Sequence, residues 1–151
     1  MIGRVSRGIC LRFVDASVFV HGIINPTRSL SEKEIKMKEN AAKIIQRINT
    51  GEKVGITTVQ ISEIANILES HSPEKASLVK EFLIKAPSVK IYTVNRAMLK
   101  EAHSLSLEYT PNRIGLNDSV AYVIMINHGY NEIYSFDKDF DTLKNIKRID
   151  M

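Results

Sequence analysis

Short apolar, β-branched segments alternate with longer segments of helical apolar spacing along most of the chain. Apolar residues at every third or fourth position predict a helix, whereas a short apolar run between turn residues predicts a buried strand. Alternation of this kind is typical of a parallel sheet, because each crossover between parallel strands needs a helix that covers the sheet. The sequence therefore predicts an α/β fold, a three-layer α/β/α sandwich with a mostly parallel sheet of four or five strands.

Capping and turn residues set the limits of the predicted elements. Ser31 with Glu34 three residues later is typical of a helix start, Gly51 of a helix end, and Pro73 of a first helical turn. Strands are predicted over 11–15, 53–57, 89–94, 132–136 and, at a sheet edge, 146–149. Helices, with their capping residues, are predicted over 31–50, 58–68, 73–86, 95–107 and 117–127, and loops over 25–30 and 109–115.

The chain has 151 residues, of which 44% are hydrophobic and 25% charged, so we expect one domain spanning 1–151 with a basic N-terminal extension at 1–11. The only cysteine, Cys10, has no partner for an intramolecular disulfide, which favours a reducing, cytoplasmic location. Asp15 interrupts the apolar stretch that follows the basic start, so this region does not match a secretory signal peptide.

Four acidic residues fall where predicted strands end or their neighbouring helices begin. Asp15 ends the first strand, and Asp137 directly follows the fourth. Glu63 lies in the early turns of the helix after the second strand, and Asp118 lies in the first turn of the helix before the fourth. Singly, each has an ordinary explanation, because acids favour first helical turns and Asp often forms turns. In an open parallel sheet, however, functional groups collect beyond the carboxyl ends of the strands.

The helix faces that carry Glu63 and Asp118 are otherwise apolar, so we expect both faces to point inward. The residues at helical spacing are Val59 and Ile67 for the first, and Ala121, Tyr122 and Met125 for the second. An inward carboxylate costs several kcal/mol unless it is compensated, and neither helix offers Lys or Arg at a matching offset. A divalent cation would compensate it, and oxygen ligands favour Mg²⁺ or Mn²⁺ over zinc.

The charge balance outside these four acids points to a phosphate-bearing substrate. Lys and Arg number 21 against 17 Asp and Glu, a net charge of +4, and the chain without the four acids carries +8. A basic periphery attracts phosphates. Cations held by an acidic cluster suit phosphodiester hydrolysis, because they activate water and neutralise charge on the scissile phosphate and the leaving oxygen.

Four short motifs also follow one another along the chain. They are Phe-Val-Asp-Ala-Ser-Val-Phe-Val at 13–20, Thr-Thr-Val-Gln-Ile-Ser-Glu-Ile at 57–64, Leu-Asn-Asp-Ser-Val-Ala at 116–121, and Ile-Tyr-Ser-Phe-Asp-Lys-Asp-Phe at 133–140. Their order and spacing resemble the PIN-domain nucleases, which include the VapC-type toxins. The resemblance covers residues 12–149 and implies a Mg²⁺- or Mn²⁺-dependent endoribonuclease acting on RNA. It also implies a parallel sheet flanked by helices and, in a toxin–antitoxin pair, a small antitoxin protein that covers the acidic site.

The resemblance assigns residues of this chain to the catalytic and metal-binding site. Metal binding and catalysis fall to Asp15, Glu63, Asp118 and Asp137, with Ser17 and Ser135 as supporting polar neighbours. Asp139 is a candidate fifth metal ligand, and its alternative is a role in the turn before Phe140. Glu69 is the nearest rival to Glu63, but it lies later on the helix and further from the strand end.

Several readings stay open from the sequence. The chain is a toxin, a housekeeping RNA-processing nuclease, or a PIN-like module that binds RNA or protein without cutting it. The segment 21–34 is longer than in a compact toxin. The four histidines lack metal-ligand spacing, so we expect them at surface or turn positions. Apolar residues on helices 31–50 and 73–86 exceed what one sheet can cover, which favours a homodimer that meets through helical surfaces.

Overall fold

The computed structural model describes residues 11–109 and 114–151. Its strands are β1 (Arg12–Val14), β2 (Val54–Thr57), β3 (Val89–Tyr92), β4 (Glu132–Tyr134) and β5 (Lys147–Ile149). Its helices are α1 (Ala16–Ile23), α2 (Glu32–Asn49), α3 (Thr58–His71), α4 (Pro73–Lys85), α5 (Arg96–Glu108), α6 (Leu116–Asn127) and the 3₁₀ helix η2 (Lys138–Thr142). Cys10, most of the expected basic extension and most of the loop 109–115 lie outside the described residues.

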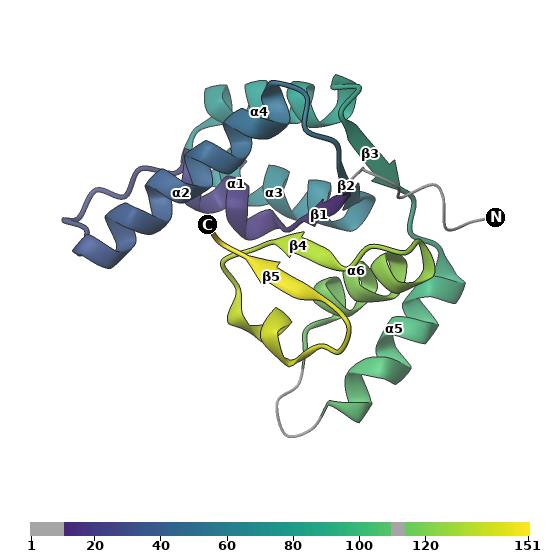
Figure 1. Ribbon diagram of the computed structural model, residues 1–151. Helices are drawn as coiled ribbons and strands as arrows, with labels where there is room; N and C mark the ends of the chain where they lie inside the picture. The colour runs from purple at the N-terminus through teal and green to yellow at the C-terminus, as the bar shows by residue number, and fades with distance from the viewer. Residues whose placement is uncertain (1–10, 110–113) are drawn as a thin grey trace.

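All five strands pair in parallel, in the order β3-β2-β1-β4-β5. This confirms the α/β prediction, including the place of the last strand at a sheet edge. Helices cover both faces of the sheet, with α1 to α4 on one side and α5 and α6 on the other (Figure 1). Because β1 is central and has β4 beside it, segments far apart in the chain meet at the middle of the sheet.

Side chains of the central strands alternate between two apolar cores, as the two-residue period of a strand requires. Phe13 and Ile133 pack in the core beneath α5 and α6, and Val14 and Tyr134 pack in the core beneath α1 to α4. All four are fully buried. The strands are therefore covered on both faces, and their carboxyl ends are held firmly where the chain leaves the sheet.

Side-chain hydrogen bonds cap helices at their predicted starts. Ser31 and Glu34 form a capping box, in which the Ser31 side chain accepts from Glu34 N and the Glu34 carboxylate accepts from Ser31 N. Pro73 occupies the first turn of α4, and the Asn95 side chain caps α5 by accepting from Met98 N. Local chemistry thus fixed these boundaries to within about two residues of their predicted positions.

Two elements were not predicted. The α1 segment contains the β-branched residues Val18 and Val20, which do not favour helix, yet Asp15 caps it and Val18 and Phe19 are buried against the core. The short η2 helix follows Asp137, whose side chain accepts a hydrogen bond from Asp139 N. In both places a local aspartate cap and tertiary packing outweigh intrinsic propensity.

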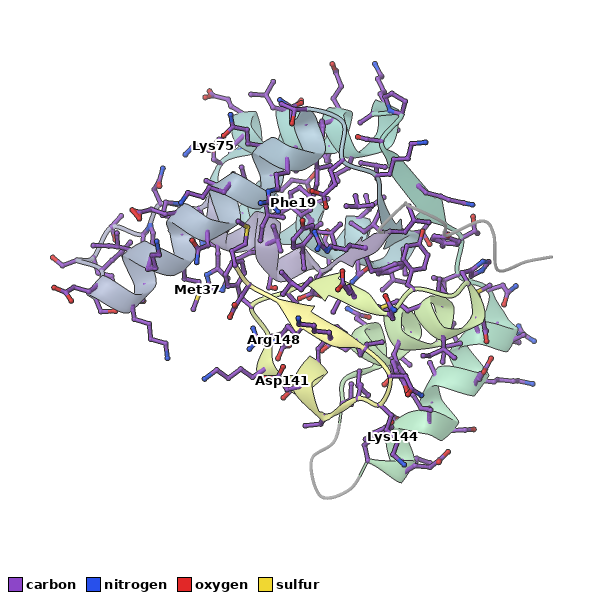
Figure 2. The ribbon with its side chains drawn as sticks, in the orientation of Figure 1. Phe19, Met37, Lys75, Asp141, Lys144 and Arg148 are labelled. Carbon is purple, nitrogen blue, oxygen red and sulfur yellow. The ribbon has the colours of Figure 1, made fainter. Side chains whose placement is uncertain are left out.

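The η2 helix is also tied to the edge of the sheet. Arg148 on β5 donates from Nε to Asp141 Oδ1 at 2.9 Å, and the two side chains lie together in Figure 2. A second Arg148 nitrogen donates to the backbone carbonyl of Ser135 at 3.1 Å. These bonds fix η2 against the segment that follows β4. Among the described helices, none has the length and apolar content to cross a membrane.

Candidate metal centre

The four acids predicted from the sequence line one cavity of about 460 Å³. Asp15 follows β1 and caps α1, and Asp137 follows β4, so these two come from neighbouring central strands. Glu63 is contributed by α3 and Asp118 by the first turn of α6. The structure therefore brings together carboxylates from four elements at the carboxyl edge of the sheet.

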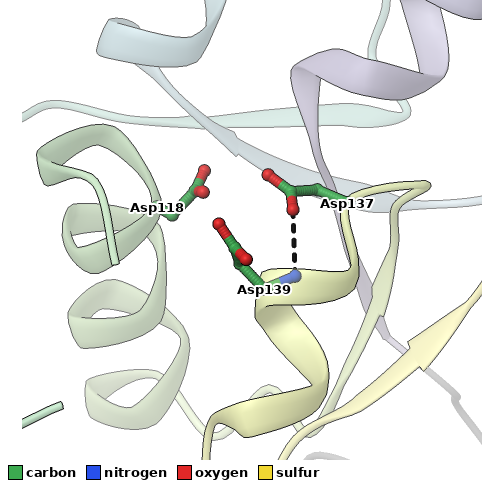
Figure 3. Close-up of side chains that lie close together, drawn as sticks. All are labelled: Asp118, Asp137 and Asp139. Carbon is green, nitrogen blue, oxygen red and sulfur yellow. Dashed lines mark hydrogen bonds between the residues drawn. The ribbon is translucent and has the colours of Figure 1, made fainter. Parts of the chain in front are cut away.

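Three carboxylates lie closest together. One oxygen each of Asp118, Asp137 and Asp139 lies within 4.8 Å of the others, and Figure 3 shows the three side chains facing a common space. A Mg²⁺ or Mn²⁺ ion with ligand distances near 2.1 Å holds its oxygens about 3 to 4 Å apart, so this set fits a hard divalent cation. Asp139 also takes part in the turn before Phe140, because its backbone N–H donates to Asp137 Oδ1 at 2.9 Å.

Asp15 is 5% exposed and is held by hydrogen bonds on both carboxylate oxygens. Its Oδ2 accepts from Ser17 Oγ at 2.7 Å and from Ser135 Oγ at 2.9 Å. Ser135 Oγ in turn accepts from Asp137 N at 2.9 Å, and Ser17 Oγ accepts from Phe136 N at 3.0 Å. The two serines named from the sequence therefore link the segment after β1 to the segment after β4.

Burial and mutual repulsion oppose ionisation in this cavity. Burial first, and then the charges of Asp15, Asp137 and Glu63, raise the pKa of Asp118 to about 8. Burial likewise raises the pKa of Glu63, against a hydrogen bond from Asn117, and the pKa of Asp139. Among the described residues that line the cavity, His21 is the only basic one. Carboxylates arranged without a protein cation are suited to hold a metal cation.

A family model for the PIN domain matches residues 12–146. The chain belongs to the PIN-domain family. Membership supports a nuclease activity, and PIN nucleases use divalent metal ions, which agrees with the acidic group described above. No curated protein gave a significant match to this sequence.

The fold of this PIN domain is also found in solved structures. The crystal structure of VapC20 from Mycobacterium tuberculosis, described as a toxin that cleaves the sarcin-ricin loop, superposes with a TM-score of 0.70 at 15% sequence identity. The match covers 90% of this chain and 96% of VapC20. At this identity the likeness concerns the fold, and it confirms the parallel sheet with helices on both faces.

Glu63 and Glu69 lie in different surroundings on α3 of the PIN domain. Glu63 lines the acidic cavity and accepts from Asn117 Nδ2 at 3.3 Å, whereas Glu69 forms an ion pair with Lys80 on α4. The expected inward face of this helix needs a correction. The row with Glu63 is only half-buried, because it lies at the mouth of the cavity, and the buried row is Gln60, Ile64 and Leu68.

Gln60 is the site residue that the sequence argument missed. It is 1% exposed, its Oε1 accepts from Thr57 N at 3.1 Å, and its Nε2 donates to Asp15 Oδ1 at 3.3 Å. Since Oε1 is committed to the N–H of Thr57, the amide must present its donor to Asp15. The Thr-x-x-Gln spacing of a capping box at 57–60 was the signal that could have revealed a buried, oriented side chain here.

Gln60→Met is expected to weaken Mn²⁺ binding by about tenfold, because outer-sphere partners that orient a ligand typically contribute 10- to 100-fold. Methionine keeps the buried volume but removes the donor to Asp15 Oδ1. Isothermal titration calorimetry with Mn²⁺ measures the effect. Gln46→Met on the exposed part of α2 is the matched control, and equal affinity in both variants would contradict a positioning role for Gln60.

The metal-free protein is expected to lose stability as the pH rises from about 4 to 8. Folding raises the pKa of Asp118 from 3.8 to about 8, so in this window the folded chain holds a proton that the unfolded chain has released. The free energy of unfolding therefore falls with rising pH. Thermal unfolding in EDTA across this range measures the slope. Saturating Mn²⁺ should flatten it, because the bound ion favours the ionised carboxylates.

Proposed function

We propose that this PIN domain is an endoribonuclease that hydrolyses phosphodiester bonds in RNA with Mg²⁺ or Mn²⁺. The observation that carries the proposal is the convergence of Asp15, Glu63, Asp118 and Asp137 on one cavity, where burial and like charge raise the pKa of Asp118. Such a cavity repels a phosphodiester by itself, so it needs cations before an RNA backbone can approach.

Each acid has a distinct place in this proposal. Asp118 and Asp137 hold the metal from opposite sides of the cavity, with Asp139 as a further ligand at its rim. Asp15 supplies an oxygen whose direction is fixed by Ser17, Ser135 and Gln60. Glu63, at the mouth, completes the shell or orients the attacking water. When bound, divalent ions activate that water and neutralise charge on the scissile phosphate and the leaving oxygen.

The test is cleavage of end-labelled single-stranded RNA by the purified protein. We expect products with Mg²⁺ or Mn²⁺, none after EDTA, and recovery when excess Mn²⁺ is added back. Cleavage that EDTA does not affect would contradict the metal mechanism. Metal binding without cleavage of any RNA in a varied panel would instead favour a PIN-like module that binds RNA or protein.

We further propose that the nuclease is the toxin of a toxin–antitoxin pair, inhibited by a small antitoxin protein. The support is the family and the fold shared with VapC20, itself a toxin. Induction of the wild-type chain should arrest growth, co-expression of an adjacent small open reading frame should relieve the arrest, and Asp15→Asn should not arrest growth. Harmless overproduction of active enzyme would favour a housekeeping RNA-processing role.

We also propose a two-fold homodimer that meets through helical surfaces. Large apolar side chains are exposed on α2 and α4, where Ile35 is 46%, Leu78 72% and Ile84 61% exposed. Light scattering at micromolar concentration should give about twice the chain mass of 17.1 kDa. Leu78→Glu should shift it to the monomer, because a buried charge without a partner is costly. A monomeric, active wild type would contradict the proposal.

A further inference from the structure

A second cavity adjoins the acidic cavity and differs from it in character. Its volume is about 290 Å³, and it shares Val20, His21 and Ile67 with the acidic cavity. We name it the side groove, lined in addition by Ile24, Pro26, Arg28, Leu30, Glu34, Met37, Lys38 and His71. The loop between α1 and α2 forms one wall, and α1, α2 and α3 contribute the rest. The two cavities are thus neighbours that have His21 in their common wall.

Positive charge gathers beside this groove at the end of α1. Lys38 Nζ donates to the Ile24 carbonyl at 2.7 Å and to the His21 carbonyl at 3.3 Å. Lys75 Nζ, from α4, donates to the Ile23 carbonyl at 3.4 Å. Both ammonium groups cap the carboxyl end of a helix, a position that favours cations. Arg28 in the lining of the side groove is paired with Glu34, so Lys38 leaves the groove with a net positive charge, whereas the acidic cavity carries negative charge.

The floor of the groove between these charges is apolar. Val20, Ile24 and Ile67 are half-buried, and Leu30 and Met37 also line the groove. The His21 ring meets Phe136 edge to face, with centroids 5.5 Å apart and an interplanar angle of 68°. His21 is otherwise exposed, so its ring is fixed at one edge and open toward the groove. Apolar side chains and a fixed aromatic ring are the surface on which unstacked bases pack.

We propose that the side groove binds the nucleotide that adjoins the scissile phosphate, so that single-stranded RNA leaves the acidic cavity on the α1–α2 side. The base packs on His21 and the apolar floor, and the phosphate beyond it faces Lys38. This inference rests on the proposed ribonuclease function and adds to it a direction for the RNA strand and a residue that contacts a base.

The size of the groove and its place beside the acidic cavity favour a nucleotide over a protein segment. A volume of about 290 Å³ is close to the lower limit for small-ligand sites, which run from roughly 300 to 1,000 Å³. Because the groove and the acidic cavity have three lining residues in common, an RNA strand with its scissile phosphate at the acids has the groove within reach of its next base. A base paired in a duplex cannot turn into such a groove, which makes the site selective for single strands.

The test measures RNA binding separately from cleavage. Asp118→Asn provides a background that is expected not to cut, in which fluorescence anisotropy follows a labelled 10-nucleotide RNA in Mg²⁺. His21→Ala in this background is expected to weaken binding by about tenfold through loss of base stacking. Lys38→Gln keeps a donor for the Ile24 carbonyl but removes the charge, so it should reduce the slope of log affinity against log salt by about one.

Matched variants and a second ligand separate the possible outcomes. His103→Ala on α5 and Lys43→Gln on α2 are exposed, lie outside the groove and should leave RNA affinity unchanged. The Mn²⁺ affinity of His21→Ala in the wild-type background should also be unchanged, which would show that the variant folds with its acidic cavity intact. If the wild type cleaves RNA and both groove variants bind RNA as tightly as their background, the inference is overturned and the proposed function stands. If the wild type does not cleave RNA, the proposed function itself is overturned. Loss of inhibition by a co-expressed partner protein, with RNA affinity intact, would assign the groove to a protein and overturn the inference.

Discussion

Asp118→Asn is expected to reduce metal-dependent RNA cleavage by at least about a hundredfold while the fold stays intact. Asp118 contributes an oxygen to the closest triplet of carboxylates, and it is the acid whose pKa is raised to about 8 by burial and by the charges around it. An amide keeps the shape of the side chain but supplies neither the charge that holds a cation nor an equivalent ligand. Single-turnover cleavage of labelled RNA measures the loss.

The same substitution should stabilise the metal-free protein. The raised pKa means that, at neutral pH, the chain must either take up a proton on Asp118 when it folds or keep a charge in the cavity, and the neutral amide avoids both costs. In EDTA at pH 8 we expect the thermal midpoint to rise by roughly a few degrees. Mn²⁺ should raise the wild-type midpoint more than that of the variant.

Activity and stability therefore move in opposite directions, which separates a metal ligand from a structural residue. Glu101→Gln on α5 is the matched control, because it neutralises an exposed acid outside the cavity and should change neither quantity. Full cleavage activity in purified Asp118→Asn would refute the metal mechanism. A fall in the metal-free midpoint would show that Asp118 stabilises the fold.

Gly55→Ala is expected to destabilise the protein by about 1 to 3 kcal/mol, the usual range for overpacking a filled core. Gly55 is a buried residue of β2, and a Cβ there would lie 2.7 Å from Tyr130 Oη and 2.8 Å from Phe13 Cδ1. The Phe13 ring cannot yield easily, because it is fully buried and packs edge to face on Tyr130 with centroids 5.1 Å apart. Urea unfolding followed by circular dichroism measures the cost.

Gly115→Ala provides the control for this prediction. Its Cβ would meet nothing within 4 Å, and its φ of −62° is open to any residue. The free energy of unfolding should therefore change little. Equal destabilisation by both substitutions would show that the loss comes from glycine itself rather than from the contact with Phe13 and Tyr130.

Sequence periodicity and capping patterns were enough to predict the layers, the five strands and the position of each acid relative to its strand. They could not predict which face of α3 turns inward, because a glutamine is normally assigned to the solvent-exposed face. Gln60 is buried because its amide forms hydrogen bonds with Thr57 and Asp15. The face was therefore placed one position away. A buried polar residue with dedicated partners breaks the rule that apolar spacing marks the core.

The α1 helix and His21 show a second limit of sequence reasoning. Val18 and Val20 favour extended structure, and the Asp15 cap together with packing on the sheet makes the segment helical. Without that helix, nothing in the sequence places His21 beside Asp15 or against Phe136. The position of a lone histidine in the structure depends on a tertiary contact that spans more than a hundred residues, which no local pattern encodes.

The parallel pairing of β1 with β4 determines when the acidic cavity can form during synthesis. Phe13 on β1 pairs with Ile133 on β4. Asp15 is therefore synthesised more than a hundred residues before Asp137, and the two acids come together only after β4 pairs with β1. Contacts of such large sequence separation form late in folding, because the loop between them must first be closed. A nascent or truncated chain that lacks β4 holds only part of the acidic cluster. If the chain cuts RNA, it is therefore harmless to the machinery that translates it until β4 has been made and has joined β1.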